Sequence, residues 1–273
     1  MILSGSIHAV VNAMIKGGGD RPINRMAQMA LTSGASTFIA LPFVPFVDLP
    51  SGAWGWLGIA LVVHIIYFIC LVRALDAGDL SSAYPVFRGT APLVTLAGSV
   101  LLMGDALHLV EVLGTLMIVA GVLVMLWGRH VNRLTLRWSL ATGVLIAAYT
   151  MIDAQGVRAA PNPASFIVWL FFLMGFVSIL VLPLFAKGGF MAAAAIQWKS
   201  ALLAGFLSVI TFGTALYALS MGPTAPLAAL RETGMVTALI ISIFVLREPA
   251  TKGKVAAILT ICAGALVLLG AAA

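Results

Sequence analysis

GDLSSAYPVFRGTAPLVTLAGSVLLMGD, residues 78–105, is apolar over a length that predicts a membrane-spanning helix. Arg88 lies near its middle, where a lipid-facing arginine costs roughly 2.5–3.5 kcal/mol on insertion scales. Pro85 and Pro92 each lack the N–H that would bond a carbonyl of the preceding turn. Loosened backbone and charge at this depth are tolerated where they are buried in protein or line a cavity. We therefore expect this helix to face a central cavity; the alternative is a kinked packing helix whose arginine snorkels or pairs with an acid.

The same pattern recurs 143 residues later, so the chain contains an internal repeat. RGT at 88–90 matches RET at 231–233, and VLGTLMIVAGVLVML at 112–126 matches VAAILTICAGALVLL at 255–269. A repeat of half the chain constrains the fold more than any single motif does.

The composition excludes a soluble domain, because 62% of the 273 residues are hydrophobic and only 9% are charged. Soluble domains carry about 25% charged residues, so lipid must solvate this chain. The formal charge of +6 comes from short loops, which favours anionic lipid headgroups over nucleic acid as the partner. Cys70 and Cys262 lie in apolar runs and the four histidines are scattered, so we expect no metal site and no cofactor.

Ten apolar segments, separated by short loops with turn or charge signals, predict an all-α integral membrane protein with ten transmembrane helices. The segments are 2–16, 26–47, 52–75, 79–103, 110–128, 136–156, 164–186, 198–220, 223–246 and 253–272. Five segments per repeat is an odd number, so the repeats 1–130 and 131–273 must enter the membrane in opposite orientations. Such inverted five-helix repeats are typical of secondary transporters, whose substrate site lies near the bilayer midplane between the repeats.

Each repeat offers two polar residues four positions apart in its first helix, and such residues share one helix face. The first repeat has His8 and Asn12, and the second has Tyr149 and Asp153. A role in the site and a polar contact between helices are equally good interpretations of His8 and Asn12. Asp153 is an ionisable group in an apolar segment, which favours a functional role.

Small residues in the fifth and tenth segments, among them Gly114, Gly121 and Gly264, predict closely packed helix faces. Those segments carry little else that is polar, so helix contact within the chain is the preferred interpretation. A homodimer contact is the second.

The lysines and arginines are distributed unevenly between the two sides of the predicted bundle. Twelve of the fifteen flank the odd-numbered loops: Lys16, Arg21, Arg25, Arg73, Arg129, Arg133, Arg137, Lys187, Lys199, Arg247, Lys252 and Lys254. Only Arg158 lies in an even-numbered loop, and Arg88 and Arg231 are intramembrane. Positive residues mark the cytoplasmic side, so this distribution places both termini outside the cytoplasm.

Seven stretches carry a resemblance to a known family. They are GDLSSAYPVFRGTAPL (78–93), GDAL (104–107), VLGTLMIVAGVLV (112–124), LREP (246–249), ICAGALVLL (261–269), HAVVNAMIKGGGD (8–20) and AAYTMIDAQGVR (147–158). Together they resemble the bacterial drug/metabolite transporter superfamily, in its ten-helix branch with two EamA-type repeats.

The resemblance implies a multi-pass protein of the bacterial inner (cytoplasmic) membrane that exports or exchanges small metabolites. Amino acids, sugars, nucleotide derivatives and cationic drugs are all represented among the substrates of that superfamily. Its ten-helix members generally have cytoplasmic termini, which opposes the charge distribution. This sequence lacks a basic C-terminal tail, and we follow its charges.

Two arginines at matched positions, Arg88 and Arg231, are the main candidates for substrate binding. A guanidinium binds carboxylate or phosphate bidentately, which favours a substrate with an anionic group. The alternative is that each arginine pairs with a neighbouring acid, Arg231 with Asp153.

Two intramembrane acids, Glu232 and Asp153, could bind a substrate ammonium group or carry a coupling proton. Tyr84 and Tyr149 are candidate wall residues of the same site. An amino acid or related amphoteric compound fits both charges. We therefore expect a secondary active transporter of small polar metabolites, an exporter or exchanger that works by alternating access.

Two other classes of function, a lipid flippase and a membrane enzyme, would require different features. A flippase for lipid-linked sugars or lipids, which the same superfamily contains, would need a side opening toward the bilayer. A membrane enzyme would need a metal-ligand constellation or an activated nucleophile. The sequence shows no such cluster, so we expect no enzymatic activity.

The charge distribution predicts that Ala273 lies outside the cytoplasm. Alkaline phosphatase fused after Ala273 should therefore be active, because its disulfides form only in an oxidising compartment. A fluorescent protein exported to the same point should stay dark. The opposite pair of results would show that the topology of the family prevails over the loop charges.

Overall fold

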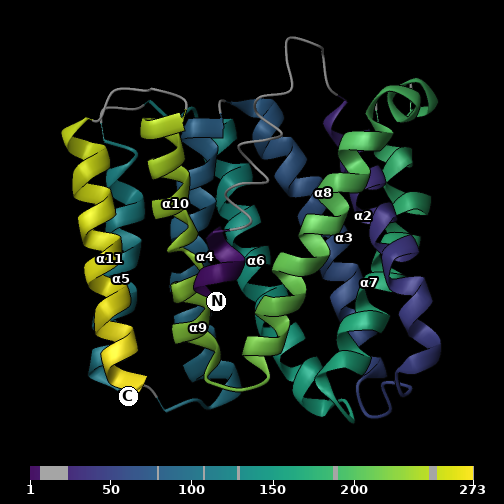
Figure 1. Cartoon of the computed structure of the whole chain (residues 1–273). Coiled ribbons are helices and arrows are strands. Elements are labelled where there is room, and N and C mark those ends of the chain that lie inside the picture. The colour runs from purple at the N-terminus through teal and green to yellow at the C-terminus, as the bar shows by residue number, and fades with distance from the viewer. Residues whose placement is uncertain are drawn as a thin grey trace.

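The computed structural model describes residues 1–6, 24–78, 80–106, 108–127, 130–186, 190–245 and 251–272. The helices run roughly along one common axis and form a bundle (Figure 1). His8, Asn12 and all but the start of the first expected segment lie outside the described residues.

Seven helices in the described part of the chain are long and apolar enough to cross a membrane. They are α2 (Arg25–Ala40, continued by the 3-10 turn η1, Leu41–Phe46), α3 (Trp54–Ala77), α4 (Leu80–Met103), α6 (Arg133–Ala159), α7 (Pro163–Val181, continued by η2, Leu182–Phe185), α8 (Phe190–Leu219) and α11 (Lys252–Ala272). α5 (Leu109–Val124) is apolar but shorter. The expected count of ten is therefore not confirmed, although nine of the ten expected segments fall on helical chain.

The prediction of a single continuous helix over 223–246 is wrong, because the helix is interrupted near its middle. The chain forms α9 (Thr224–Arg231), then a tight turn, then α10 (Gly234–Ile240) and a π-helical turn η3 (Ile241–Val245). At the turn the N–H groups of Glu232 and Thr233 bond carbonyls only three residues back. The Thr233 hydroxyl also donates to the Leu230 carbonyl, at 2.7 Å, and such side-chain bonds compete with the helical ladder.

Asparagine side chains fix the beginning of three helices. Asn24, Asn132 and Asn162 each accept an N–H three residues later, at the starts of α2, α6 and α7. Such caps satisfy backbone donors that have no partner inside the helix. These bonds explain why the helices begin where polar loop sequence gives way to apolar sequence.

The outer surface of the bundle is apolar, as lipid contact requires. Large side chains such as Phe46, Trp127 and Phe244 are exposed by 76–86%. The side chains that are fully buried lie between helices, for example Leu57, Phe166, Leu170 and Leu216 from α3, α7 and α8. The inner side chains are thus covered by neighbouring helices, and the outer apolar side chains are suited to contact with lipid.

The small-residue faces of α5 and α11 pack against each other within the chain. A Cβ added at Gly264 would lie 2.7 Å from the Gly114 carbonyl oxygen, and one at Gly121 would lie 3.1 Å from that of Ala257. The contact confirms the preferred interpretation of these residues. A homodimer stays a prediction.

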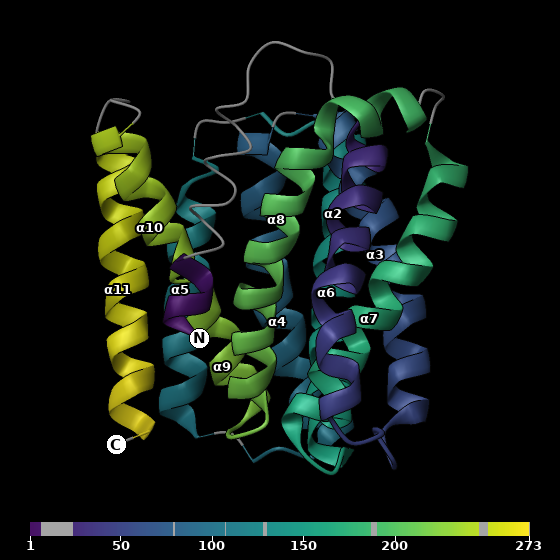
Figure 2. The ribbon, with the colours of Figure 1, turned by 45° about the vertical axis from the view of Figure 1, so that its right-hand side comes forward.

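α2 and α7 meet in a similar close contact that uses hydroxyl groups as well as glycine. The Ser36 hydroxyl donates to the Phe171 carbonyl at 3.0 Å, and the Thr37 hydroxyl donates to the Phe172 carbonyl at 2.8 Å. Gly175 leaves room for the Ser33 backbone. α2 runs antiparallel to α7, and α5 runs antiparallel to α11 (Figures 1 and 2).

The helix ends that carry basic residues gather at one end of the bundle. α2, α6 and α11 begin at the upper end in Figure 1, with Arg25, Arg133 and Lys252 as their first residues. At the opposite end Arg158 donates hydrogen bonds to the carbonyls of Leu219 and Gly222. The fold therefore separates the charges as the loops suggest, while the orientation in the membrane stays a prediction.

The α5–α11 contact can be tested with two substitutions on one helix. Gly264→Leu should lower the free energy of unfolding by about 1–3 kcal/mol, because the larger side chain meets the α5 backbone. Gly270→Leu is the matched control, since a Cβ there meets nothing within 4 Å. Reversible unfolding of the purified protein in mixed micelles measures both. Equal stability of the two variants would contradict the packing.

Candidate functional site

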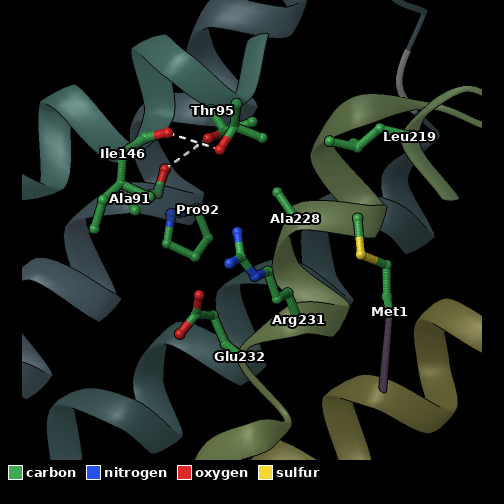
Figure 3. Close-up of a pocket in the computed structure, with 10 residues that line it drawn as sticks. Met1, Ala91, Pro92, Thr95, Ile146, Leu219, Ala228, Arg231 and Glu232 are labelled. Atoms are coloured by element: carbon green, nitrogen blue, oxygen red, sulfur yellow. Dashed lines mark hydrogen bonds between the residues drawn. The ribbon is translucent and has the colours of Figure 1, made fainter. Parts of the chain in front are cut away.

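A pocket opens between α4, α6, α8 and α9, with about 320 Å³ of unfilled space when its open mouth is included. Its walls are Ala91, Pro92 and Thr95 of α4, Ile146 and Thr150 of α6, Leu219 of α8, Ala228 and Arg231 of α9, Glu232 of the following turn, and Met1. Figure 3 shows the side chains of Arg231 and Glu232 pointing into this space beside Pro92. The turn that interrupts the expected helix thus brings two adjacent charged groups to one cavity.

Arg88 is not among the wall residues of this pocket, and it pairs with Glu232. Its Nη1 donates to Glu232 Oε1 at 3.0 Å, and the two side chains are only 10% and 4% exposed. Its Nη2 donates to the Tyr84 hydroxyl at 3.1 Å, and the guanidinium lies 5.2 Å from the centre of that ring. The alternative role of an acid-paired arginine therefore applies to Arg88, and it links α4 to the turn after α9.

Arg231 stands at the last residue of α9 and has no carboxylate within 4 Å among the described residues. Its guanidinium lies over the Phe212 ring, 5.3 Å from the centroid. Its buried Nε, like Glu232 Oε2, has no hydrogen-bond partner in the described part of the chain. The C-terminal end of a helix favours a cation, which offsets part of the cost of this charge. The alternative interpretation, a pairing of Arg231 with Asp153, is therefore not found among the described residues.

Asp153 instead faces a histidine that the sequence interpretation left aside. His64 Nε2 of α3 lies 3.5 Å from Asp153 Oδ2 of α6, and both side chains are almost fully buried. The other ring nitrogen, Nδ1, lies 2.8 Å from the Ala60 carbonyl. An ionisable histidine in the apolar run LVVHIIYFIC was the signal that could have identified it.

Tyr149 belongs to an aromatic cluster behind the pocket rather than to its wall. Its ring stacks on that of His64 with centroids 4.4 Å apart, and Tyr67 and Phe212 meet it edge-on. Tyr84 likewise lies beside Arg88. Of the expected site residues that the structure describes, Arg231 and Glu232 line the pocket, whereas Arg88, Tyr84, Tyr149 and Asp153 are not among its wall residues.

The threonines of the wall were not expected from the sequence. The Thr95 and Thr150 hydroxyls donate to the carbonyls of Ala91 and Ile146, four residues back, at 2.9 and 2.7 Å (Figure 3). A threonine in a helix often donates to the carbonyl four residues back, wherever the helix lies. The presence of threonines in these helices therefore does not indicate a cavity. Only the packing of α4 and α6 in the structure identifies Thr95 and Thr150 as wall residues.

Comparison with protein families gives the context of this site. A model of the EamA-like transporter family matches residues 1–127 and, a second time, residues 134–270. The chain belongs to the EamA-like transporter family. The resemblance to the drug/metabolite transporter superfamily is thereby confirmed, and the protein is a multi-pass membrane transporter.

Known structures agree with the EamA-like assignment at the level of the fold. Matches are found to 29 chains of solved structures. One of them, described as "Crystal structure of protein", superposes with a TM-score of 0.78 over 99% of this chain and 95% of its own, at 19% sequence identity. No curated protein matches the sequence.

The ion pair of this EamA-like protein should behave as a buried pair. Arg88→Ala or Glu232→Ala alone should cost about 3–5 kcal/mol of unfolding free energy, because each leaves one uncompensated charge. The double variant should recover much of that loss. The same cycle on Arg25 and Asp76, an exposed pair 2.7 Å apart with side chains 50% and 53% exposed, should give about 0.2–1 kcal/mol. Equal coupling energies in the two cycles would contradict the burial.

Proposed function

We propose that this EamA-like transporter is a secondary active transporter of small amphoteric metabolites, amino acids or related compounds, in the bacterial cytoplasmic membrane. The observation that carries the proposal is the pair of adjacent wall residues Arg231 and Glu232. Each has a buried polar atom without a partner among the described residues. A carboxylate of the substrate would accept from the Arg231 guanidinium, and its ammonium group would donate to Glu232 Oε2.

The charge arrangement explains why a soluble zwitterion would leave water for this pocket. A guanidinium offers two parallel donors that match a carboxylate. Charge-assisted hydrogen bonds of this kind are roughly twice as strong as neutral ones. Because Glu232 already accepts from Arg88 through Oε1, its second oxygen is held in place and directed at the site. The cavity thus presents a fixed cation and a fixed anion side by side.

Alternating access by two inverted repeats is supported by the pairing of helices. α2 and α7 lie at the repeat offset of 143 residues, as do α5 and α11, and each pair packs antiparallel. α9 and α10 form an interrupted helix beside the pocket, a feature of transporters built from inverted repeats. We propose that the two repeats, 1–130 and 131–273, rock about this site and that the protein exports or exchanges its substrate.

The lipid flippase remains the alternative function. It would need a pocket open to the bilayer between helices, and the described wall residues give no specific reason to prefer it. A transport panel that includes a lipid-linked sugar distinguishes the two proposals directly.

Transport by purified protein in liposomes tests the role of Arg231. Labelled amino acids, the corresponding amines and the deaminated acids form the panel, and the amino acids should be transported best. Arg231→Lys should weaken the apparent affinity ten- to a hundred-fold, because losing one charge-assisted hydrogen bond costs about 1.5–3 kcal/mol.

Arg88→Lys is the matched control, since it is the same change at an intramembrane arginine that does not line the pocket. It should weaken the affinity less than Arg231→Lys does, because Arg88 reaches Glu232 through one hydrogen bond and a lysine keeps a positive charge opposite that carboxylate. Wild-type affinity in Arg231→Lys, at normal protein yield, would refute the binding role. An equal loss in both variants would show that the substitution acts on the fold rather than on the site.

A further inference from the structure

His64 and Asp153 are placed so that one added proton would form a hydrogen bond between them. His64 Nδ1 lies 2.8 Å from the Ala60 carbonyl, which can only accept a hydrogen bond. Nδ1 therefore carries its hydrogen in every protonation state of the ring. The charge of the imidazole is decided at Nε2 alone, and Nε2 is the atom that faces Asp153.

Without a further proton, this contact places two electron pairs against each other. Nε2 would present its lone pair to Oδ2 at 3.5 Å. Neither of these atoms, nor Oδ1, has a hydrogen-bond partner in the described part of the chain. A carboxylate buried in this way without donors is costly. One proton between Nε2 and Oδ2 turns the contact into a hydrogen bond and neutralises the net charge of the pair.

The surroundings connect this proton to the pocket. The titratable or charged groups around the pair are Tyr67 of α3, Tyr149 of α6 and Arg231 of α9. Among the described residues, α8 places the Phe212 ring against His64, and Arg88 of α4 lies near the two tyrosines. The charge of Arg231 acts on both His64 and Asp153. Arg231 is also the wall residue that the proposed function assigns to the substrate.

We propose that His64 and Asp153 hold one exchangeable proton between Nε2 and Oδ2, and that a substrate with net negative charge binds more tightly when this proton is present. The step consists of proton uptake from water and its later return, with one N–H or O–H bond formed and then broken. The claim about substrate binding rests on the proposed function, because it assumes that the anionic group of the substrate binds Arg231. The unprotonated pair adds a negative charge close to that group, whereas the protonated pair adds none. By linkage, binding of the anion and of the proton favour each other equally.

Infrared spectroscopy of the purified protein tests the proton site without any substrate. The acidic form of the wild type should show the C=O stretch of a buried carboxylic acid if the proton lies on Oδ2, or the ring band of an imidazolium if it lies on Nε2, and this band should disappear as the pH rises. Asp153→Asn should lack the band and stay folded, because its amide can donate to Nε2 as the protonated acid does. His64→Gln should shift the band. A spectrum in which both variants keep the wild-type band and titration would overturn the proton site.

Binding of leucine and of its deaminated counterpart 4-methylpentanoate, measured between acid and alkaline pH, tests the coupling. The affinity of the wild type for 4-methylpentanoate should fall by up to roughly tenfold per unit of rising pH, as linkage to one proton allows. In Asp153→Asn it should be independent of pH. The same pH dependence in this variant would overturn the coupling. If neither compound binds to the wild type, the proposed function and the coupling both fail, and the infrared titration still decides the proton site.

Discussion

The buried ion pair between Arg88 and Glu232 determines which charged side chains of the site are neutralised. A bilayer cannot solvate an isolated arginine, so each intramembrane guanidinium needs a partner or a wet cavity. The repeat supplies two arginines but only one glutamate, because the position equivalent to Glu232 in the first repeat is Gly89. A side chain at Gly89 would meet Leu123, 2.8 Å from its Cβ. One arginine is therefore neutralised, and the other, Arg231, is left to the pocket.

The two repeats also differ in the helix that carries this motif, which is continuous in the first repeat and interrupted in the second. RGT at 88–90 continues as helix in α4, whereas RET at 231–233 ends α9. Gly234, the first residue of α10, lies in backbone contact with Gly5, and the Thr237 hydroxyl donates to that of Ser6 at 2.9 Å. A residue with a side chain at Gly234 would push this crossing apart. Because of this turn, Glu232 bonds Arg88 while the adjacent Arg231 lines the cavity. A continuous helix would orient these two side chains differently.

The sequence was sufficient for the parts of the fold that depend on local hydropathy. The expected segments 79–103 and 253–272 correspond closely to α4 and α11, because the ends of an apolar run and its caps are local properties. The partners of the charged residues could not be predicted in the same way. The sequence left open whether Arg231 pairs with Asp153 or faces a substrate site, because the partner of a buried charge depends on the rotation and packing of neighbouring helices. His64 was overlooked because a single histidine in an apolar helix has no motif, and its meaning appears only when α6 brings Asp153 against it.

The charges around the pocket also determine which net charge a substrate should carry. Arg88 and Glu232 cancel each other, and an ionised Asp153 cancels Arg231 while His64 is neutral. The cluster is then neutral overall, which suits a zwitterion that adds no net charge. With the proton between His64 and Asp153, the cluster carries one positive charge and suits a monoanion. Since net charge is costly in a low-dielectric interior, a proton should accompany the monoanion but not the zwitterion. Under the proposed function, the same wall residues would therefore bind both classes of substrate, and the protonation of the His64–Asp153 pair would select between them.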